Sequence, residues 1–314
     1  MLAKRRAGFH NAGMEMIRLG TRGSPLALAQ AEMTAAALQE AHGIATEIVV
    51  ITTTGDRVQD RPLAEIGGKA LWTKELDAAL IDGRIDCAVH SMKDVETGLN
   101  PDIVLAAMLP RADVRERLLG AASIADLPQG ARVGTSSPRR AAQLRARRPD
   151  LAIEMLRGNV ATRMAKVESG AIDATLLAAA GLDRLGVAIG SLIGTDEMLP
   201  ASAQGAVGIT ARRGDEATLA VLAGIDHATT HQAVTLERGF LAALGGTCHS
   251  PVAALAEING EHVRFRGELL AEDGSEVRRG GFEAPLAEAM PRVAALAAEL
   301  LAEASPGLHA LFHP

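Results

Sequence analysis

Apolar and polar stretches alternate along the chain at strand and helix lengths. In the first third, apolar runs of strand length predict strands at 16–22, 46–54, 85–90 and 103–109. Between these expected strands, two segments with one polar and one apolar face predict helices at 25–41 and 71–81. Strands that alternate with helices in this way predict a mainly parallel sheet covered by helices.

The same alternation starts again near Asp113. The expected strands are 131–134, 153–156, 173–178 and 205–211, and the expected helices are 138–147, 160–169 and 179–185. Two successive α/β units predict two lobes with a cleft between them, and such clefts are common ligand sites.

The pattern changes after Arg212. Two helices at 215–222 and 227–244 precede strands at 252–258, 262–271 and 276–283, and a helix at 285–303 ends the pattern. Asn259-Gly260 and Asp273-Gly274 are typical of hairpin turns. The expected fold class is therefore α/β: two α/β lobes with a cleft, plus a smaller α+β C-terminal domain.

Composition narrows the possible partners. A chain of 314 residues is long enough for two or three domains. Aromatic residues make up 2% of it and the net charge is -6, which argues against a nucleic-acid partner. Two cysteines cannot form a disulfide framework, so we expect a reducing, cytoplasmic setting. No apolar run is long enough to span a membrane.

No metal motif is present, because His90 and His249 have no companions at ligand spacing. The basic start of the chain is not followed by the apolar run of a secretory signal. We therefore expect residues 1–15 to be a disordered extension.

Arginine residues occur where the start of a helix disfavours them. Ser137 and Pro138 are typical of a helix cap and first turn, yet Arg139 and Arg140 follow at once. The N-terminus of a helix already carries partial positive charge, so two arginines there indicate a bound anion.

The arrangement recurs at two other expected helix starts. Arg22 precedes Ser24-Pro25, and Arg157 precedes Gly158-Asn159, with Arg163 one turn into the next helix. Three such helix starts predict a ligand with several acidic groups. The alternative is that these arginines are solvated surface residues.

A carboxylate follows the expected strand 85–90 in the run His90-Ser91-Met92-Lys93-Asp94. Asp94 can be a positioned acid or base there, or simply a cap or an exposed ion-pair partner. The glycines of Gly67-Gly68-Lys69 lack the full phosphate-loop pattern, so we predict no nucleotide site.

The two cysteines differ in context. Cys87 lies within an expected strand, where a buried, inert thiol is typical. Cys248 lies in Gly245-Gly246-Thr247-Cys248-His249-Ser250-Pro251, which predicts a tight, accessible loop. An accessible thiol is either chemically used or an ordinary surface residue.

Taken together, these segments resemble the porphobilinogen deaminase family, also called hydroxymethylbilane synthase. The stretches that carry the resemblance are Arg22-Gly23-Ser24-Pro25-Leu26-Ala27, Gly67-Gly68-Lys69, His90-Ser91-Met92-Lys93-Asp94, Val133-Gly134-Thr135-Ser136-Ser137-Pro138-Arg139-Arg140, Leu156-Arg157-Gly158-Asn159-Val160 with Arg163, Ala180-Gly181-Leu182-Asp183-Arg184-Leu185-Gly186, Gln204-Gly205-Ala206-Val207-Gly208 and the Cys248 loop. They span the chain from about residue 17 to its end.

The resemblance implies a transferase of haem and other tetrapyrrole (porphyrin) biosynthesis. Such an enzyme joins four porphobilinogen molecules head to tail, with loss of ammonia, onto a dipyrromethane cofactor, and hydrolysis then releases hydroxymethylbilane. It also implies two lobes like those of periplasmic solute-binding proteins. We expect domain 1 at 16–112 and 200–225, domain 2 at 113–199 and domain 3 at 226–314, in a cytoplasmic monomer.

The resemblance also implies roles for single residues. Cys248 would carry the dipyrromethane through a thioether, and Asp94 would be catalytic. The expected cofactor-binding residues are Lys93, Asp94, Thr135, Ser136, Ser137, Arg139 and Arg140. The expected substrate-binding residues are Arg22, Ser24, Arg157, Arg163, Arg184 and Gln204.

The chain departs from the family pattern in places. Thr247 stands where many relatives have glycine, and Glu96 stands where proline is common, so the loop after Asp94 can differ. Two alternatives stay open: a two-lobed binding module for a polyanionic small molecule, and an enzyme that uses Cys248 with His249 as nucleophile and base. We further expect the polar loop 56–68 to be mobile and to cover the cleft.

Overall fold

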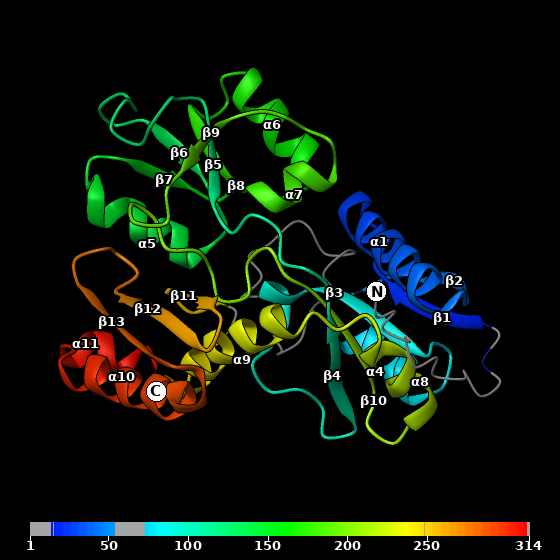
Figure 1. Cartoon of the computed structure of the whole chain (residues 1–314). Coiled ribbons are helices and arrows are strands. Elements are labelled where there is room, and N and C mark those ends of the chain that lie inside the picture. The colour runs from blue at the N-terminus through cyan, green and yellow to red at the C-terminus, as the bar shows by residue number, and fades with distance from the viewer. Residues whose placement is uncertain (1–13, 15, 54–72, 248, 313–314) are drawn as a thin grey trace, which may run out of the picture.

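The structure is a computed structural model that describes residues 14, 16–53, 73–247 and 249–312. It contains three sheets with helices around them (Figure 1). The predicted loop 56–68, and the predicted extension 1–15 apart from Met14, lie outside the described residues.

Lobe 1 is built on a five-stranded sheet in the order β2-β1-β3-β10-β4. The strands are β1 (Met16–Thr21), β2 (Ala45–Val50), β3 (Cys87–Ser91), β4 (Ile103–Met108) and β10 (Val207–Arg212), and the helices are α1 (Pro25–His42), α4 (Lys74–Ile81) and α8 (Glu216–Ala223). Alternate residues of the strands face opposite sides. Cys87, fully buried as expected, packs with Leu38 of α1 and Leu222 of α8, whereas Ala88 packs with Leu80 of α4.

Lobe 2 has a second five-stranded sheet, in the order β7-β6-β8-β5-β9. Its strands are β5 (Glu116–Leu119), β6 (Arg132–Gly134), β7 (Ala152–Glu154), β8 (Ala174–Ala178) and β9 (Ser191–Ile193), and its helices are α5 (Pro138–Arg147), α6 (Val160–Glu168) and α7 (Ala179–Arg184). Leu144 of α5 packs on one face of the sheet, against Leu176. Leu182 of α7 packs on the other face, against Leu177.

The prediction of mainly parallel sheets holds for four of the five strands in each lobe, and one strand in each lobe runs against the others. In each lobe two of the four strand pairings are antiparallel: β10 runs opposite to β3 and β4, and β5 runs opposite to β8 and β9. The reason is that the chain crosses between the lobes before β5 and again before β10. The first strand after each crossing, β5 or β10, runs against the other four strands of its sheet. Each of the two takes the fourth place in the strand order. Hydrophobic periodicity carries no information about strand direction, so the sequence could not show this.

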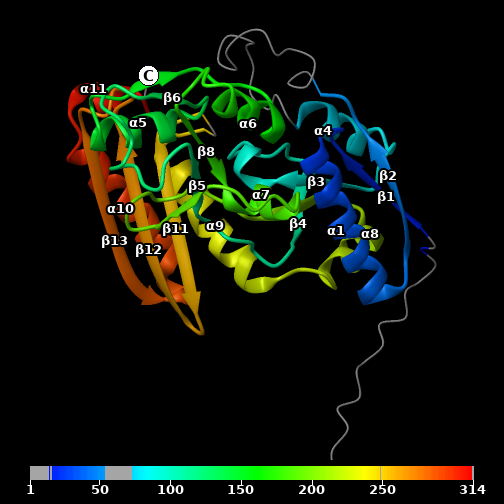
Figure 2. The same cartoon turned by 90° about the horizontal axis from the view of Figure 1, so that it is seen from above.

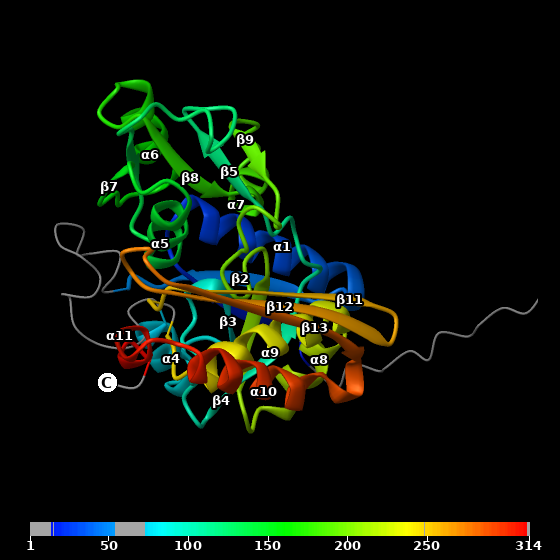
Figure 3. The ribbon, with the colours of Figure 1, turned by 90° about the vertical axis from the view of Figure 1, so that its left-hand side faces the viewer.

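The C-terminal domain is a three-stranded antiparallel sheet with helices on one face. Its elements are β11 (Val252–Asn259), β12 (His262–Leu270), β13 (Val277–Pro285), α9 (Ala228–Ala243), α10 (Ala289–Ala302) and α11 (Pro306–Ala310), with a single 3-10 turn η2 (Leu286–Glu288) between β13 and α10. Lobe 1 has another such turn, η1 (Met92–Asp94), after β3. The hairpin at Gly260 is confirmed, because Asn259 pairs with His262 across it. Figure 3 shows α9 and α10 below this sheet and α5 of lobe 2 above it.

The fold class is confirmed: two α/β lobes and a smaller sheet domain. Figure 2 shows the C-terminal sheet at the left, lobe 1 at the right and lobe 2 lying across both in this view. The sequence did not predict β5, β9 and α11. β5 and β9 are three or four residues long, and β5 begins with charged Glu116 and Arg117, so neither has the apolar run that marks a strand. The boundaries 16–112 with 200–225, 113–199 and 226–314 remain our proposal for the three domains.

Two crossing segments, 109–115 and 199–206, link the lobes and are bonded to each other. Ala112 N–H donates to the Gly205 carbonyl, and the Gln204 side chain donates to the Val114 carbonyl at 2.8 Å. Gly205 has φ +82°, and a Cβ there would come within 2.6 Å of the Ala112 carbonyl oxygen, so only glycine fits this contact.

The Glu237 carboxylate of α9 joins these segments to the C-terminal domain. It is fully buried and accepts two bonds from Arg111, at 2.7 and 2.9 Å. It also accepts the backbone N–H of Ala203, at 2.6 Å, and of Ala256 on β11, at 2.9 Å. One side chain therefore holds both crossing segments and the third sheet.

None of the helices within the described residues is both long and apolar enough to cross a membrane.

We predict that Glu237→Gln destabilises the protein by about 3–5 kcal/mol, because the change leaves the Arg111 guanidinium buried without a charge partner. Urea unfolding measures the effect. Glu283→Gln is the matched control in the same domain: Glu283 pairs with Arg264 at 3.9 Å on the surface, and its loss should cost less than about 1 kcal/mol. Equal losses in the two variants would contradict the assignment.

Candidate active site

A cavity of about 1300 Å³ lies between the lobes and receives residues from both. Lobe 1 contributes Arg22, Ser24, Lys93 and Asp94 to its wall. Lobe 2 contributes Ser136, Arg140, Arg157, Arg163 and Arg184, and the second crossing segment contributes residues 203, 205 and 206. Nine of the predicted site residues therefore surround one space.

The three predicted helix starts are confirmed. Ser24 caps α1 by accepting Ala27 N–H at 3.3 Å, Ser137 caps α5 by accepting Arg140 N–H at 3.4 Å, and Asn159 caps α6 by accepting Thr162 N–H at 2.9 Å. Ser24 and Asn159 line the cavity, so the N-termini of α1 and α6 face it from opposite lobes. Both helix ends present partial positive charge to a ligand there.

Three cations of the cavity wall make no ion pair with any carboxylate among the described residues: Lys93, Arg163 and Arg184. Arg163 donates to the Gly158 carbonyl at 3.0 Å and to Ser136 Oγ at 3.4 Å. Burial, and then the neighbouring Arg140, lower the pKa of Arg163 to about 10. Burial likewise lowers the pKa of Lys93 and of Arg184. An anionic ligand would relieve this cost of desolvation.

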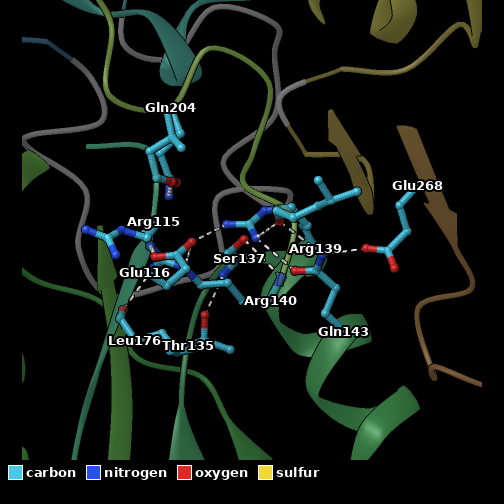
Figure 4. A network of polar contacts seen from close by, with 12 residues as sticks. Arg115, Glu116, Thr135, Ser137, Arg139, Arg140, Gln143, Leu176, Gln204 and Glu268 are labelled. Atoms are coloured by element: carbon cyan, nitrogen blue, oxygen red, sulfur yellow. Dashed lines mark hydrogen bonds and ion pairs between the residues drawn. The ribbon is translucent and has the colours of Figure 1, made fainter. Parts of the chain in front are cut away.

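Arg139 and Arg140 differ from the sequence interpretation in one respect: the anion beside them belongs to the chain. Both pair with Glu116 of β5, at 2.6 Å and 2.7 Å, and all three side chains are buried (Figure 4). Arg140 still lines the cavity, whereas Arg139 is not part of its wall. Two arginines at a helix start indicate a nearby anion. That anion can be a ligand or, as here, a carboxylate of the same chain.

Asp94 ends the 3-10 turn η1 that follows β3, and it is half-buried in the cavity wall. It also borders a side pocket of about 70 Å³. No described residue donates a hydrogen bond to its carboxylate, and the charges that act on it include those of Lys93 and Arg163. A carboxylate in the cavity wall without a donor among the described residues can accept hydrogen bonds from ligand N–H groups.

Three further predicted residues lie outside the cavity wall. Thr135 is buried and accepts the N–H of Ser137 at 3.1 Å, and Ser137 itself caps α5. Gln204 is fully buried and bonds across the two crossing segments. These side chains support the backbone beside the site.

Cys248 lies outside the described residues, but the residues on both sides of it are described. Thr247 N–H donates to Ser250 Oγ at 2.9 Å, so the described residues on the two sides are bonded to each other. The carbonyl of Gly246 accepts a bond from Thr97 Oγ1 at 3.0 Å. Thr97 lies three residues after Asp94. This bond therefore holds the residues just before position 248 beside the segment that follows Asp94.

Sequence reasoning missed Glu116, and it missed Gln30 in α1. The Gln30 side chain is buried, lines the cavity and donates to Ser91 Oγ at 2.8 Å. A signal for Gln30 existed, because it occupies the buried stripe of α1 together with Ala31, Thr34 and Leu38. No comparable signal marked Glu116, whose partners are more than twenty residues away in the sequence.

Comparison with known proteins identifies the family. A family model described as "Porphobilinogen deaminase, dipyromethane cofactor binding domain" matches residues 17–220, and one for the C-terminal domain of porphobilinogen deaminase matches 231–302. The chain belongs to the porphobilinogen deaminase family. The porphobilinogen deaminase of Sphingopyxis alaskensis is 58% identical over 94% of this chain and 96% of its own length. The chloroplastic porphobilinogen deaminase of Oryza sativa subsp. japonica is 47% identical over 94% of this chain and 86% of its own.

The predicted family and enzyme class, a porphobilinogen deaminase of the transferase class, are confirmed, and the binding-module and nucleophile alternatives are set aside. A solved structure of the methionine-binding protein MetQ is 14% identical, with a TM-score of 0.44 over 70% of this chain and 91% of that one.

The cavity suits the cofactor that the porphobilinogen deaminase model names. A dipyrromethane carries several carboxylates and two pyrrole N–H groups. Lys93, Arg163 and Arg184 offer partly buried positive charge without a carboxylate partner among the described residues, and Asp94 offers acceptor oxygens. The donor set and the acceptor therefore match the two kinds of polar group on such a molecule.

His90 lies in the wall of the side pocket, beside the turn that carries Asp94. It is buried, and its Nε2 bonds with Thr210 Oγ1 at 2.9 Å. Burial, with smaller contributions from Arg238 and Arg22, lowers the pKa of His90 to about 4. His90 is therefore neutral in the folded protein at neutral pH.

We predict that His90 makes the protein less stable as the pH falls from about 6.5 to about 4, because the unfolded chain binds a proton there and the folded chain does not. The loss should reach about 3 kcal/mol at most. Urea unfolding of wild type and His90→Asn at several pH values measures it: the variant should lose less stability over this range. The control is His262→Asn at an exposed position of β12. Parallel profiles for wild type and His90→Asn would contradict the prediction.

Proposed function

We propose that this chain joins four porphobilinogen molecules head to tail, with loss of ammonia, onto a dipyrromethane held through a thioether on Cys248, and releases hydroxymethylbilane by hydrolysis. The observation that carries the proposal is the position of Asp94. Its carboxylate lies in a cavity lined by cations from both lobes, and the loop that flanks Cys248 is bonded to the segment just after it.

Asp94 would accept hydrogen bonds from pyrrole N–H groups and stabilise positive charge. In each addition the bond between the aminomethyl carbon and nitrogen of porphobilinogen breaks and ammonia leaves. A new carbon–carbon bond then forms, and the attacked pyrrole carbon loses its proton. Positive charge develops on the substrate ring during these steps, and a carboxylate fixed next to the ring lowers its energy. When bound, the dipyrromethane would supply the pyrrole carbon to which the first unit is joined.

The cavity cations would hold the acetate and propionate groups. The dipyrromethane and four added units make six linked pyrroles with about twelve carboxylates, so the fully extended chain on the enzyme needs many positive groups along its path. We assign Lys93, Ser136 and Arg140 to the cofactor. We assign Arg22, Ser24, Arg157, Arg163 and Arg184 to the substrate and the growing chain.

Four residues would act without touching the ligand. Thr135 and Ser137 shape the start of α5, Arg139 fixes Glu116, and Gln204 holds the two crossing segments together. Their place outside the cavity wall supports this indirect role over the direct contacts expected from the family.

We further propose that the protein works as a cytoplasmic monomer, with small molecules as its ligands and neither nucleic acid nor membrane as a partner. The acidic net charge, the scarcity of aromatic residues and the presence of only two cysteines support this setting.

The attachment residue is tested by intact mass. Purified wild type should carry the mass of one dipyrrole, and Cys248→Ala should carry none and show no turnover, because the primer has no anchor. Cys87→Ala is the control: Cys87 is fully buried in β3, so this variant should keep the adduct. Active wild-type protein with an unmodified Cys248 would rule out the proposal.

The acid is tested by Asp94→Ala. Turnover should fall by about 10²-fold or more, because a fixed charge next to the reacting ring is lost. Circular dichroism and the unfolding midpoint should stay close to wild type, since the Asp94 carboxylate makes no hydrogen bond to a described residue. Asp82→Ala, at an exposed position in lobe 1, is the control and should keep wild-type turnover. Activity near wild type in Asp94→Ala would overturn the role.

A further inference from the structure

The Glu116 carboxylate is fixed from several sides in the interior of lobe 2. Its Oε1 accepts Arg139 Nη2 at 2.6 Å and Arg140 Nε at 3.1 Å, and its Oε2 accepts Arg140 Nη2 at 2.7 Å. Burial alone would raise the pKa of Glu116, but Arg140 and Arg139 outweigh it and hold that pKa far below its usual range. Glu116 is therefore negatively charged at neutral pH.

The Arg140 guanidinium has one fixed orientation as a result. Its Nε and Nη2 bond Glu116, and its Nη1 donates to the Leu176 carbonyl at 3.0 Å. A guanidinium has five N–H groups, so these bonds leave two on Nη1 and Nη2. Because Arg140 lines the cavity, these two N–H groups are the donors that it has left for a ligand carboxylate.

Arg139 lies on the other side of Glu116 and does not line the cavity. Its Nη1 donates to Gln143 Oε1 and to the Leu199 carbonyl, at 2.8 and 2.9 Å, while the Gln143 amide donates to Glu268 of β12. Figure 4 shows this chain of contacts running from Arg140 through Glu116 and Arg139 to Glu268. The support of Glu116 thus extends into the C-terminal sheet.

We propose that Glu116 is a positioning residue of the active site: it holds Arg140 so that its two remaining N–H groups bind one carboxylate of the pyrrole ligand. This role rests on the proposed function, because it concerns the ligand of the same cavity. Nothing in the role requires Glu116 to touch the ligand.

Charge and position make opposite predictions for Glu116→Gln. The substitution removes a negative charge beneath a cationic cavity, so a purely electrostatic role predicts tighter binding of an anionic ligand. A positioning role predicts weaker binding in spite of the added net positive charge, because Arg140 loses its two-point contact with the carboxylate.

The experiment compares full-length wild type, Glu116→Gln, Glu116→Asp and the control Asp173→Asn. Asp173 makes a similar paired contact with Arg132 in the same lobe, outside the cavity wall. For each protein, intact mass gives the fraction that carries the dipyrrole, kinetics give KM and kcat for porphobilinogen separately, and urea gives the unfolding midpoint.

Glu116→Gln should lower the adduct-carrying fraction and raise KM about tenfold or more in the molecules that carry it, the scale of one charge-assisted hydrogen bond. Glu116→Asp keeps the charge on a side chain that is shorter by one methylene. Its adduct-carrying fraction and its KM should lie between those of wild type and Glu116→Gln. Asp173→Asn should match wild type in both readouts. A KM equal to or below wild type in Glu116→Gln, with the adduct intact, overturns the proposal.

Where Glu116→Gln fails to fold, Glu116→Asp decides: a KM raised about threefold or more supports positioning, and an unchanged KM overturns it. Wild-type protein without adduct and without turnover would contradict the proposed function itself, and this role with it. Active wild type together with unaffected Glu116 variants would contradict the positioning role alone.

Discussion

The architecture depends on the buried Glu237 carboxylate. Its two oxygens accept Arg111 from the first crossing segment, the Ala203 N–H from the second and the Ala256 N–H from the C-terminal sheet. Ala203 is the non-glycine residue with a positive φ, 63°, within the described chain, a conformation that costs about 1 kcal/mol or more and persists where neighbours enforce it. Ala203 and Gly205 also line the cavity. The Glu237 contact that joins the three parts of the molecule therefore also shapes part of the cavity wall.

A net acidic chain can still hold a cationic cavity because its carboxylates are distributed unevenly. Away from the cavity wall, arginines are paired with acids, as Arg18 is with Asp86 and Arg132 with Asp173. Arg163 and Arg184, at the cavity, have carbonyl or hydroxyl partners instead. Positive charge is thus concentrated where the ligand carboxylates would lie, and the overall charge of the protein does not reveal it.

The sequence predicted those features that depend on local chemistry. A serine or asparagine cap with its following residues fixes a helix start, so Ser24, Ser137 and Asn159 were found correctly. Features that depend on contacts between distant segments were not predicted. The direction of β5 and β10, the pairing of Arg139 with Glu116 and the burial of Gln204 all arise from where the chain crosses between lobes. An arginine pair needs an anion, but its sequence does not say whether the anion is a ligand or a distant glutamate.

The place of β10 in the sheet has a consequence for the order in which the molecule is made. β10 lies between β3 and β4, and β4 has no other neighbour in the sheet. The strands of lobe 2, from Glu116 to Ile193, form an uninterrupted segment that leaves the ribosome earlier. Lobe 2 can therefore close its sheet during synthesis, whereas lobe 1 waits, with β3 and β4 unjoined, until residue 212 has emerged. The lobe whose translation begins first is therefore the one whose sheet can be completed only second.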